Sequence, residues 1–297
     1  MTDVDRTRRR YIEPETTLST YRYLRISLVS AVAALIASVV ITRLASGVPQ
    51  DSVSAYYYTV SHSIFVASLG ATGLGLIVYK GEAITEDMLL NFAGFMAFVV
   101  ALVPTGRPAC QDPDPRACGL WLPSSADTDV PIPNNIFALL IAVAVGYAFF
   151  VVVDAVQGNP RATRPRRAKL EVAVRVLGGA VVVFGVVVLI VSPQTFADKA
   201  HGYAAIAMFV AMTGVVCHYA LWAETGKYSA IYTATAMLMV IGVVWAVVCL
   251  FTKGPVFWPE VLLIASFATF WITQTFDLWP QEHKYADEAD AMERAQP

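Results

Sequence analysis

Charged residues are scarce in this chain. Asp, Glu, Lys and Arg make up 15% of the 297 residues, whereas about 25% is usual for a soluble domain. Hydrophobic residues reach 57%, against roughly 45–50% in soluble domains. Long windows such as Ile26–Ile41 and Val172–Val191 hold at most one charge. This composition excludes an ordinary soluble core and indicates a polytopic membrane protein.

The chain also lacks the short motifs that would assign a common chemistry. It contains no Walker-type phosphate loop, no G-x-S-x-G nucleophile elbow, no H-E-x-x-H zinc motif and no C-x-x-C-H haem attachment site. No internal repeat relates its first half to its second, as the inverted repeats of many secondary transporters would. No enzyme or transporter class therefore follows from motifs.

Eight apolar segments follow one another along the chain. None alternates polar and apolar residues as barrel strands do, and backbone in a bilayer must satisfy its own hydrogen bonds, which leaves the helix. The segments run from Leu24 to Ala45, Val60 to Tyr79, Met88 to Val103, Asn135 to Val156, Leu170 to Val191, Ala200 to Ala223, Ile231 to Phe251, and Trp258 to Trp279. The third segment is the shortest. We predict an all-α, polytopic transmembrane bundle of eight helices.

The distribution of Lys and Arg predicts the orientation of these helices. If the N-terminus is cytoplasmic, 15 of the 21 Lys and Arg residues lie inside, 5 lie outside, and Arg175 lies within a helix. Loops on the cytoplasmic side carry the excess of positive charge. The long polar arm before Leu24 and the absence of a small-residue cleavage site argue against a signal peptide. We predict a multi-pass protein of a bacterial inner (plasma) membrane, with both termini cytoplasmic.

One membrane domain, 23–280, accounts for most of the chain. The basic segment 1–22 and the polar segment 281–297 are too short for domains, so we expect flexible cytoplasmic tails. Between helices, 104–134 is expected to form an extracytoplasmic loop and 157–169 a basic cytoplasmic loop. Such basic segments are typical of topology signals that touch anionic lipid heads. Membrane lipids are the expected partners, and nucleic acid is not.

Two of the four cysteines lie in the long predicted outer loop. Cys110 and Cys118 flank "QDPDPRA", whose prolines favour a tight, non-helical loop. An extracytoplasmic compartment tolerates disulfides, and the spacing does not fit a zinc knuckle. We predict a disulfide between Cys110 and Cys118.

Polar side chains gather near the predicted outer surface, and polar groups in a membrane are costly and often functional. His62 lies near the outer end of the second helix, while His201 and Glu260 begin the sixth and eighth. Tyr57 and Tyr58 precede the second helix, and tyrosine is enriched at membrane interfaces. These five residues are our candidates for a pocket near the outer leaflet. The alternative is an interfacial collar, where polar side chains reach water cheaply.

Two functions fit such a pocket. The first, which we favour, is a non-enzymatic binding or accessory membrane protein that handles a lipid or small molecule and needs no cofactor. The second is a metal-dependent intramembrane hydrolase of lipid amides or esters, in which His62, His201 and Glu260 hold zinc and a zinc-bound water attacks. Metal content separates the two. The substrate, protein partners and oligomeric state stay open.

Several stretches resemble a family of bacterial multi-pass integral membrane proteins of uncharacterised activity. The stretches are "SVSAYYYT", "NFAGFMAFVVALVPT", "HGYAAIAMFV", "IYTATAMLMVIG" and "PEVLLIASFATFWIT". Together they cover most of the membrane region, so the resemblance implies a shared helical membrane fold. The chain is more loosely similar to the superfamily of ceramidases and progestin-receptor-like proteins, which are intramembrane metal hydrolases. Those enzymes use an H-x-x-x-H pair on a late helix, where this chain has Glu260, Gln274 and Asp277.

Overall fold

The computed structural model describes residues 3–81, 83–106, 119–120, 131–156, 169–222 and 226–294, with side chains described between 19 and 279. Eight α-helices and no β-strand occur in these ranges. The helices are α1 (Asp3–Ser46), α2 (His62–Val78), α3 (Ile84–Leu102), α4 (Pro131–Val156), α5 (Lys169–Val191), α6 (Pro193–Trp222), α7 (Lys227–Thr252) and α8 (Phe257–Arg294). A short 3₁₀ helix, η1 (Ser54–Tyr58), precedes α2. The predicted all-α bundle of eight helices is confirmed.

Seven of the eight helices are long and apolar enough to cross a membrane. The exception is α2, whose 17 residues span about 25 Å, somewhat less than the roughly 30 Å hydrocarbon core. The third segment, expected to be the shortest, begins four residues earlier than predicted. The second is shorter than predicted because the chain makes η1 and a turn before it enters α2.

Both terminal helices are longer than the sequence suggested. α1 begins at Asp3 and α8 ends at Arg294, so helix continues through most of the two segments expected to be flexible tails. Ala and Glu, which favour helix, are frequent in the last of these segments. The predicted disulfide partners Cys110 and Cys118 lie outside the described residues, and their pairing stays a prediction.

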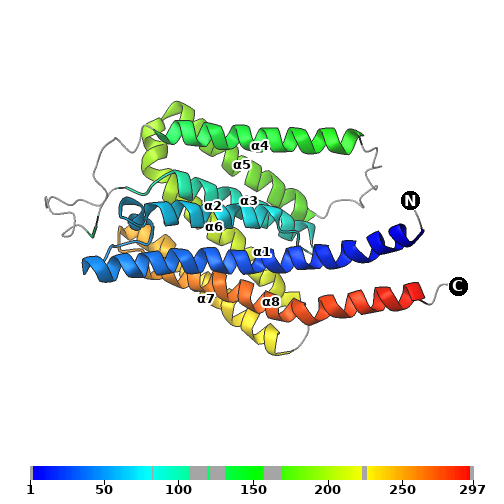
Figure 1. Cartoon of the computed structure of the whole chain (residues 1–297). Coiled ribbons are helices and arrows are strands. Elements are labelled where there is room, and N and C mark those ends of the chain that lie inside the picture. Colours follow the sequence, from blue (N-terminus) through cyan, green and yellow to red (C-terminus); the bar gives the residue numbers. More distant parts are fainter. Residues whose placement is uncertain are drawn as a thin grey trace.

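Six helices form a closed ring. In the order α1, α2, α3, α6, α7 and α8, each helix packs against the next, and α8 returns to α1. Neighbours in the ring run in opposite directions, and α1 begins at the same end of the bundle at which α8 finishes (Figure 1). There the Arg22 guanidinium donates to the Trp279 carbonyl at 3.3 Å and lies 4.3 Å from the centre of its ring. α4 and α5 lie outside the ring against α3, and α5 also contacts α6.

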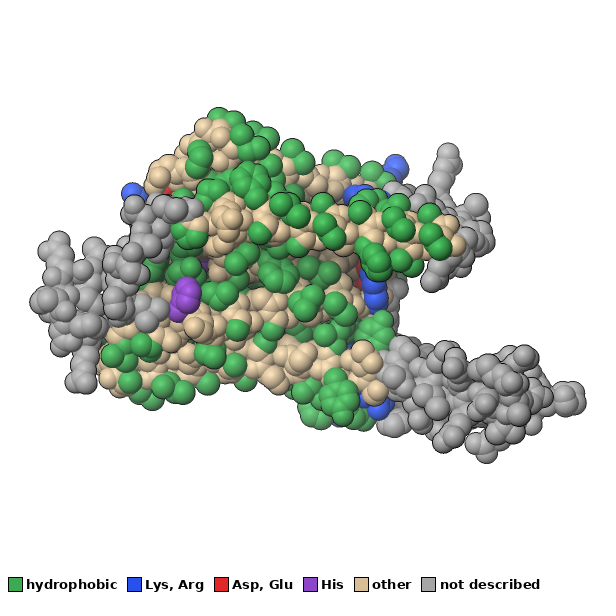
Figure 2. Space-filling view, turned by 45° about the horizontal axis from the view of Figure 1, so that its top comes forward, with side chains coloured by type: hydrophobic (Ala, Val, Ile, Leu, Met, Phe, Trp, Pro, Cys, Tyr) green, Lys and Arg blue, Asp and Glu red, His purple; other side chains and the backbone are tan. Residues whose placement is uncertain are grey.

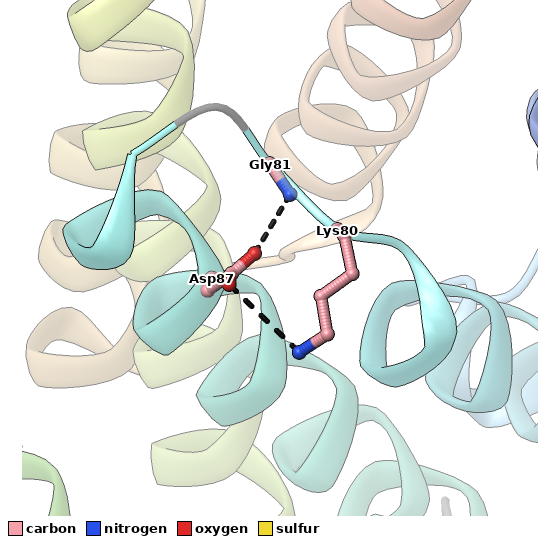
Figure 3. A network of polar contacts seen from close by, with 3 residues as sticks. All are labelled: Lys80, Gly81 and Asp87. Carbon is pink, nitrogen blue, oxygen red and sulfur yellow. Dashed lines mark hydrogen bonds and ion pairs between the residues drawn. The ribbon is translucent and has the colours of Figure 1, made fainter. Parts of the chain in front are cut away.

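Different segments of the chain lie at the two ends of the ring. One end, here called the Glu260 end, holds the end of α1, η1 and the starts of α2, α6 and α8. The other, here called the Arg25 end, holds the turn between α2 and α3. In that turn Asp87 accepts a hydrogen bond from the Gly81 backbone N–H at 2.7 Å and pairs with Lys80 at 3.8 Å (Figure 3). Asp87 lies in the first turn of α3, where a carboxylate is favoured by the helix dipole.

The outer surface of the bundle is apolar along the length of the helices. On the face shown in Figure 2, the Lys and Arg side chains lie near the helix ends and hydrophobic side chains cover much of the length between them. In α4 and α5 only 6% of the most apolar window is buried. Apolar side chains can face outward along whole helices only where lipid replaces water. The described chain therefore has the architecture of a multi-pass membrane protein.

Candidate functional site

Residues from all six helices of the ring line a cavity of about 200 Å³. Its wall is mostly apolar, with Leu35, Phe65, Phe209 and Leu263 among the residues that line it. Polar side chains also line it, and most come from the Glu260 end: Ser52, Ser54, Ser68, Thr72, Thr105, His201 and Glu260. The cavity is thus amphipathic, with an ionisable end and an apolar body.

Glu260 holds the segment before η1 in place. Ser52 Oγ donates to the carboxylate, with 2.8 Å to Oε2 and 3.0 Å to Oε1. The Val53 backbone N–H donates to Oε2 at 2.6 Å, and Ser54 Oγ donates to Oε1 at 3.0 Å. Three donors from consecutive residues therefore converge on one carboxylate. This explains the S-x-S of "SVSAYYYT": its two hydroxyls flank a backbone N–H that the same acceptor can reach.

Backbone hydrogen bonds reinforce the contact of Ser52, Val53 and Ser54 with Glu260, here called the Glu260 clamp. The carbonyl of Asp51 accepts from the backbone N–H groups of Val256 at 3.0 Å and Phe257 at 2.8 Å. These groups precede and begin α8, where backbone donors have no partner within the helix. The segment that follows α1 therefore caps α8 with a carbonyl while it donates to the carboxylate of Glu260. Its residues Ser52, Val53 and Ser54 form part of the cavity wall.

His201 is the second ionisable group on the cavity wall. It is 5% exposed, and its Nδ1 lies 2.6 Å from the carbonyl oxygen of Val103, which follows α3. A carbonyl can only accept, so in this contact Nδ1 carries the proton and the neutral ring keeps a lone pair on Nε2. Nε2 is buried and has no hydrogen-bond partner among the described residues. His201 therefore links α6 to the residue that follows α3, and its Nε2 is an acceptor without a partner among the described residues.

The remaining candidates lie at the same end but do not line the cavity. His62 Nδ1 contacts the Tyr57 carbonyl at 2.8 Å, and the two rings meet edge to face at 4.3 Å. Tyr58 is buried and donates to the Thr105 carbonyl. Burial raises the pKa of the Tyr57 phenol, which therefore stays neutral. The structure brings His201 and Glu260 to one cavity and places Tyr57, Tyr58 and His62 in a neighbouring aromatic cluster.

The described residues do not provide a complete zinc site. No group of three or more His, Cys, Asp or Glu side chains in this part of the chain is close enough to hold a metal ion. His62 is not among the residues that line the cavity. The donor set that the zinc hypothesis requires is therefore not assembled here, and zinc stays a prediction from sequence.

The deeper part of the site was not predicted from the sequence. Ser68 and Thr72 on α2 line the cavity, four residues apart on one helical face. Ser52 was not recognised as a partner of Glu260, because 208 residues separate the two in the chain. The signal that was available is spacing: Glu260, Ile264 and Phe267 recur at helical intervals and all line the cavity.

Comparison of the chain with models of known protein families, with curated proteins and with solved structures gave no match.

Proposed function

We propose that this chain is a membrane protein that binds a small amphiphile, or one chain of a lipid, inside its six-helix ring. The observation that carries the proposal is the amphipathic cavity itself, an apolar body lined by His201 and Glu260 at one end. Concave, mostly apolar sites with a few converging polar groups are the usual form of small-molecule pockets. The activity is binding, and nothing in the described residues requires a catalytic step.

The volume of the cavity limits the size of the ligand. An engineered apolar cavity of about 150 Å³ binds benzene, whereas drug-sized ligands occupy roughly 300–1,000 Å³. A cavity of about 200 Å³ therefore accepts a small molecule or part of one acyl chain. A whole phospholipid does not fit, although one of its chains could enter while the rest stays in the bilayer.

The polar end favours a head group that donates hydrogen bonds. His201 offers an acceptor at Nε2 once Nδ1–H is used by Val103. Glu260 in its ionised form is acceptor-only. A hydroxyl or amine head suits these two groups, whereas a carboxylate or phosphate would place like charge beside Glu260. We therefore expect fatty alcohols or amines to bind more tightly than fatty acids.

The orientation of the protein completes the proposal. With 15 Lys and Arg residues on one side and 5 on the other, the positive-inside rule puts the Arg25 end in the cytoplasm. The cavity then lies closer to the outer leaflet of a bacterial plasma membrane, and its ligand comes from that leaflet.

A cavity-filling variant tests the proposal. Ala205 on α6 lines the cavity, so Ala205→Leu adds volume where the ligand would lie. Val210→Leu is the matched control, because Val210 is on the same helix and 51% exposed. We expect native mass spectrometry of purified protein, supplied with a ten-carbon alcohol, amine or acid, to show one bound alcohol or amine. Ala205→Leu should weaken that binding at least tenfold.

The control separates loss of the site from loss of the fold. Val210→Leu should bind as the unaltered chain does, and thermal unfolding should show that Ala205→Leu is folded. Equal binding by both variants, or no binding of any of the three amphiphiles by the unaltered protein, would contradict the proposal.

A further inference from the structure

A second set of buried polar atoms lies at the Arg25 end, outside the amphipathic cavity. Trp271 and Gln274 are three residues apart on α8, so they share one helical face, and both are 0% exposed. Trp271 Nε1, Gln274 Nε2 and Gln274 Oε1 have no hydrogen-bond partner in the described part of the chain. Exchanging the positions of Nε2 and Oε1 in the Gln274 amide would not provide a hydrogen bond, since neither position has a partner among the described residues.

Three unpaired polar atoms in two neighbouring side chains are unusual. The large majority of buried polar side-chain atoms in proteins are hydrogen-bonded to protein or to ordered water. A buried polar atom without a hydrogen-bond partner costs free energy, and apolar side chains would occupy a dry position of this kind without this cost. Two side chains of α8 that together offer two donors and an acceptor therefore point to a ligand that can both accept and donate.

The surroundings are polar enough for such a ligand. Tyr79 meets Trp271 edge to face at 4.9 Å, and its hydroxyl accepts from Nε of Arg25, itself 3% exposed, at 3.3 Å. Tyr232 donates to Asp277, one turn beyond Gln274, at 3.0 Å. A phenol thus lies against the unpaired indole, a guanidinium binds the hydroxyl of that phenol, and a carboxylate lies one turn beyond the unpaired amide on α8.

We propose that Gln274 and Trp271 bind ordered water, which forms a hydrated site inside the ring at the Arg25 end. Water accepts from Trp271 Nε1 and the Gln274 amide N–H, and donates to Gln274 Oε1. Buried waters typically make about three hydrogen bonds, which is the number of unpaired atoms here. Leu76 and Phe267 line the amphipathic cavity, while Tyr79 and Trp271 follow them toward the Arg25 end and line no part of it. The hydrated site and the amphipathic cavity are therefore separate.

The first test is the direction of a stability change. If the amide is dry and unpaired, Gln274→Leu removes unpaired polar atoms and raises the melting temperature in detergent. If the amide binds water, the same change removes those hydrogen bonds and strands the water, and we expect the melting temperature to fall by several degrees. Thr269, which is exposed on the same helix, provides the control, since Thr269→Val should shift the melting temperature by less than one degree.

A second measurement needs no variant. X-ray radiolysis of the intact protein generates hydroxyl radicals from bound water, which oxidise the side chains beside it. We expect Trp271 to be oxidised, while Phe270, equally buried at 0% exposed and without polar atoms, stays unmodified. A rise in melting temperature for Gln274→Leu, or an unmodified Trp271, overturns the proposal. A small-molecule adduct in native mass spectra that disappears in Gln274→Leu also overturns it, in favour of a solute.

Discussion

Glu260 has two structural roles in this protein, since it holds the segment before η1 and forms part of the cavity wall. Its carboxylate accepts from Ser52, Val53 and Ser54, and it also lines the cavity. A carboxylate among apolar helices is costly unless its oxygens are paired, and three donors from one short segment supply the pairing. The residue therefore connects the closure of the bundle at this end with the chemistry of the cavity.

Removal of the Ser54 hydroxyl, one of the three donors to Glu260, should measurably weaken the Glu260 clamp. Hydrogen bonds to charged groups contribute about 1.5–3 kcal/mol, so Ser54→Ala should lower the free energy of unfolding in detergent by about that amount. In a Glu260→Gln background the same change should cost clearly less, because contacting residues are not additive. Chemical denaturation of the four proteins of this double-mutant cycle measures the difference.

Exposed Ser63 on α2 provides the control for this cycle. Ser63→Ala should change the free energy of unfolding by less than about 0.5 kcal/mol. Equal costs of Ser54→Ala with and without the carboxylate would show that Ser54 and Glu260 are not coupled.

At the scale of the elements, glycine is required in two places, after the end of α1 and where α2 crosses α3. α1 ends at Ser46, and the next residue, Gly47, has a φ of +70° and donates its N–H to the Arg43 carbonyl at 2.9 Å. This is the left-handed helix end that glycine adopts readily. α2 and α3 cross where Gly73 and Gly94 meet, since a Cβ on either would lie within 3 Å of the other's carbonyl oxygen.

The end of α1 should not tolerate a side chain. Nothing lies within 4 Å of a Cβ built on Gly47, so Gly47→Ala meets no clash and tests the backbone alone. We expect it to lower the free energy of unfolding by about 1 kcal/mol or more. Gly106 is the control, because a Cβ there is equally free and its φ is not positive. Gly106→Ala should be neutral or slightly stabilising, and a matching loss at both positions would refute the explanation.

At the crossing of α2 and α3, a side chain in place of glycine should be destabilising for a different reason, which is lack of space. A Cβ on Gly94 would lie 2.5 Å from the Gly73 carbonyl oxygen, and backbone atoms cannot move aside as a flexible side chain can. Overpacking of this kind costs about 1–3 kcal/mol, so Gly94→Ala should lower the melting temperature by several degrees. Gly179→Ala on α5, where a Cβ meets nothing within 4 Å, should have little effect. Thermal unfolding of both variants in the same detergent compares them directly.

At the scale of the whole molecule, the ring of six helices is the feature on which the cavity depends. α4 and α5 are apolar on almost every side and contribute no residue to the cavity wall. The ring therefore contains the cavity, while α4 and α5 add apolar outer surface.

Orientation can be tested with the two ends of one helix. Lys227 begins α7 at the Arg25 end, Lys253 follows it at the Glu260 end, and both are exposed. In a chain whose four native cysteines are replaced by alanine, Lys253→Cys should react with an impermeant thiol reagent in intact cells. Lys227→Cys should react only after the membrane is opened. The reverse pattern would show that the cavity is nearer the cytoplasm.

Much of this architecture could be predicted because the bilayer constrains it. Eight apolar stretches had to be helices, since backbone in a bilayer must satisfy its own hydrogen bonds. Their order along the chain then placed His62, His201 and Glu260 at the same end, as found, because successive antiparallel helices alternate direction. The bounds of α2 were less predictable, because the three tyrosines belong to a separate 3₁₀ turn.

The membership of the site was decided only by the tertiary structure. Depth along a helix follows from position in the sequence, whereas the rotation of each helix about its axis depends on how neighbours pack. That rotation directs His201 and Glu260 toward the cavity and leaves His62 against Tyr57. It also buries Trp271 and Gln274 without partners in the described residues. In lipid, apolar residues are favoured on every face of a helix, so the sequence alone carries little information about which face turns inward.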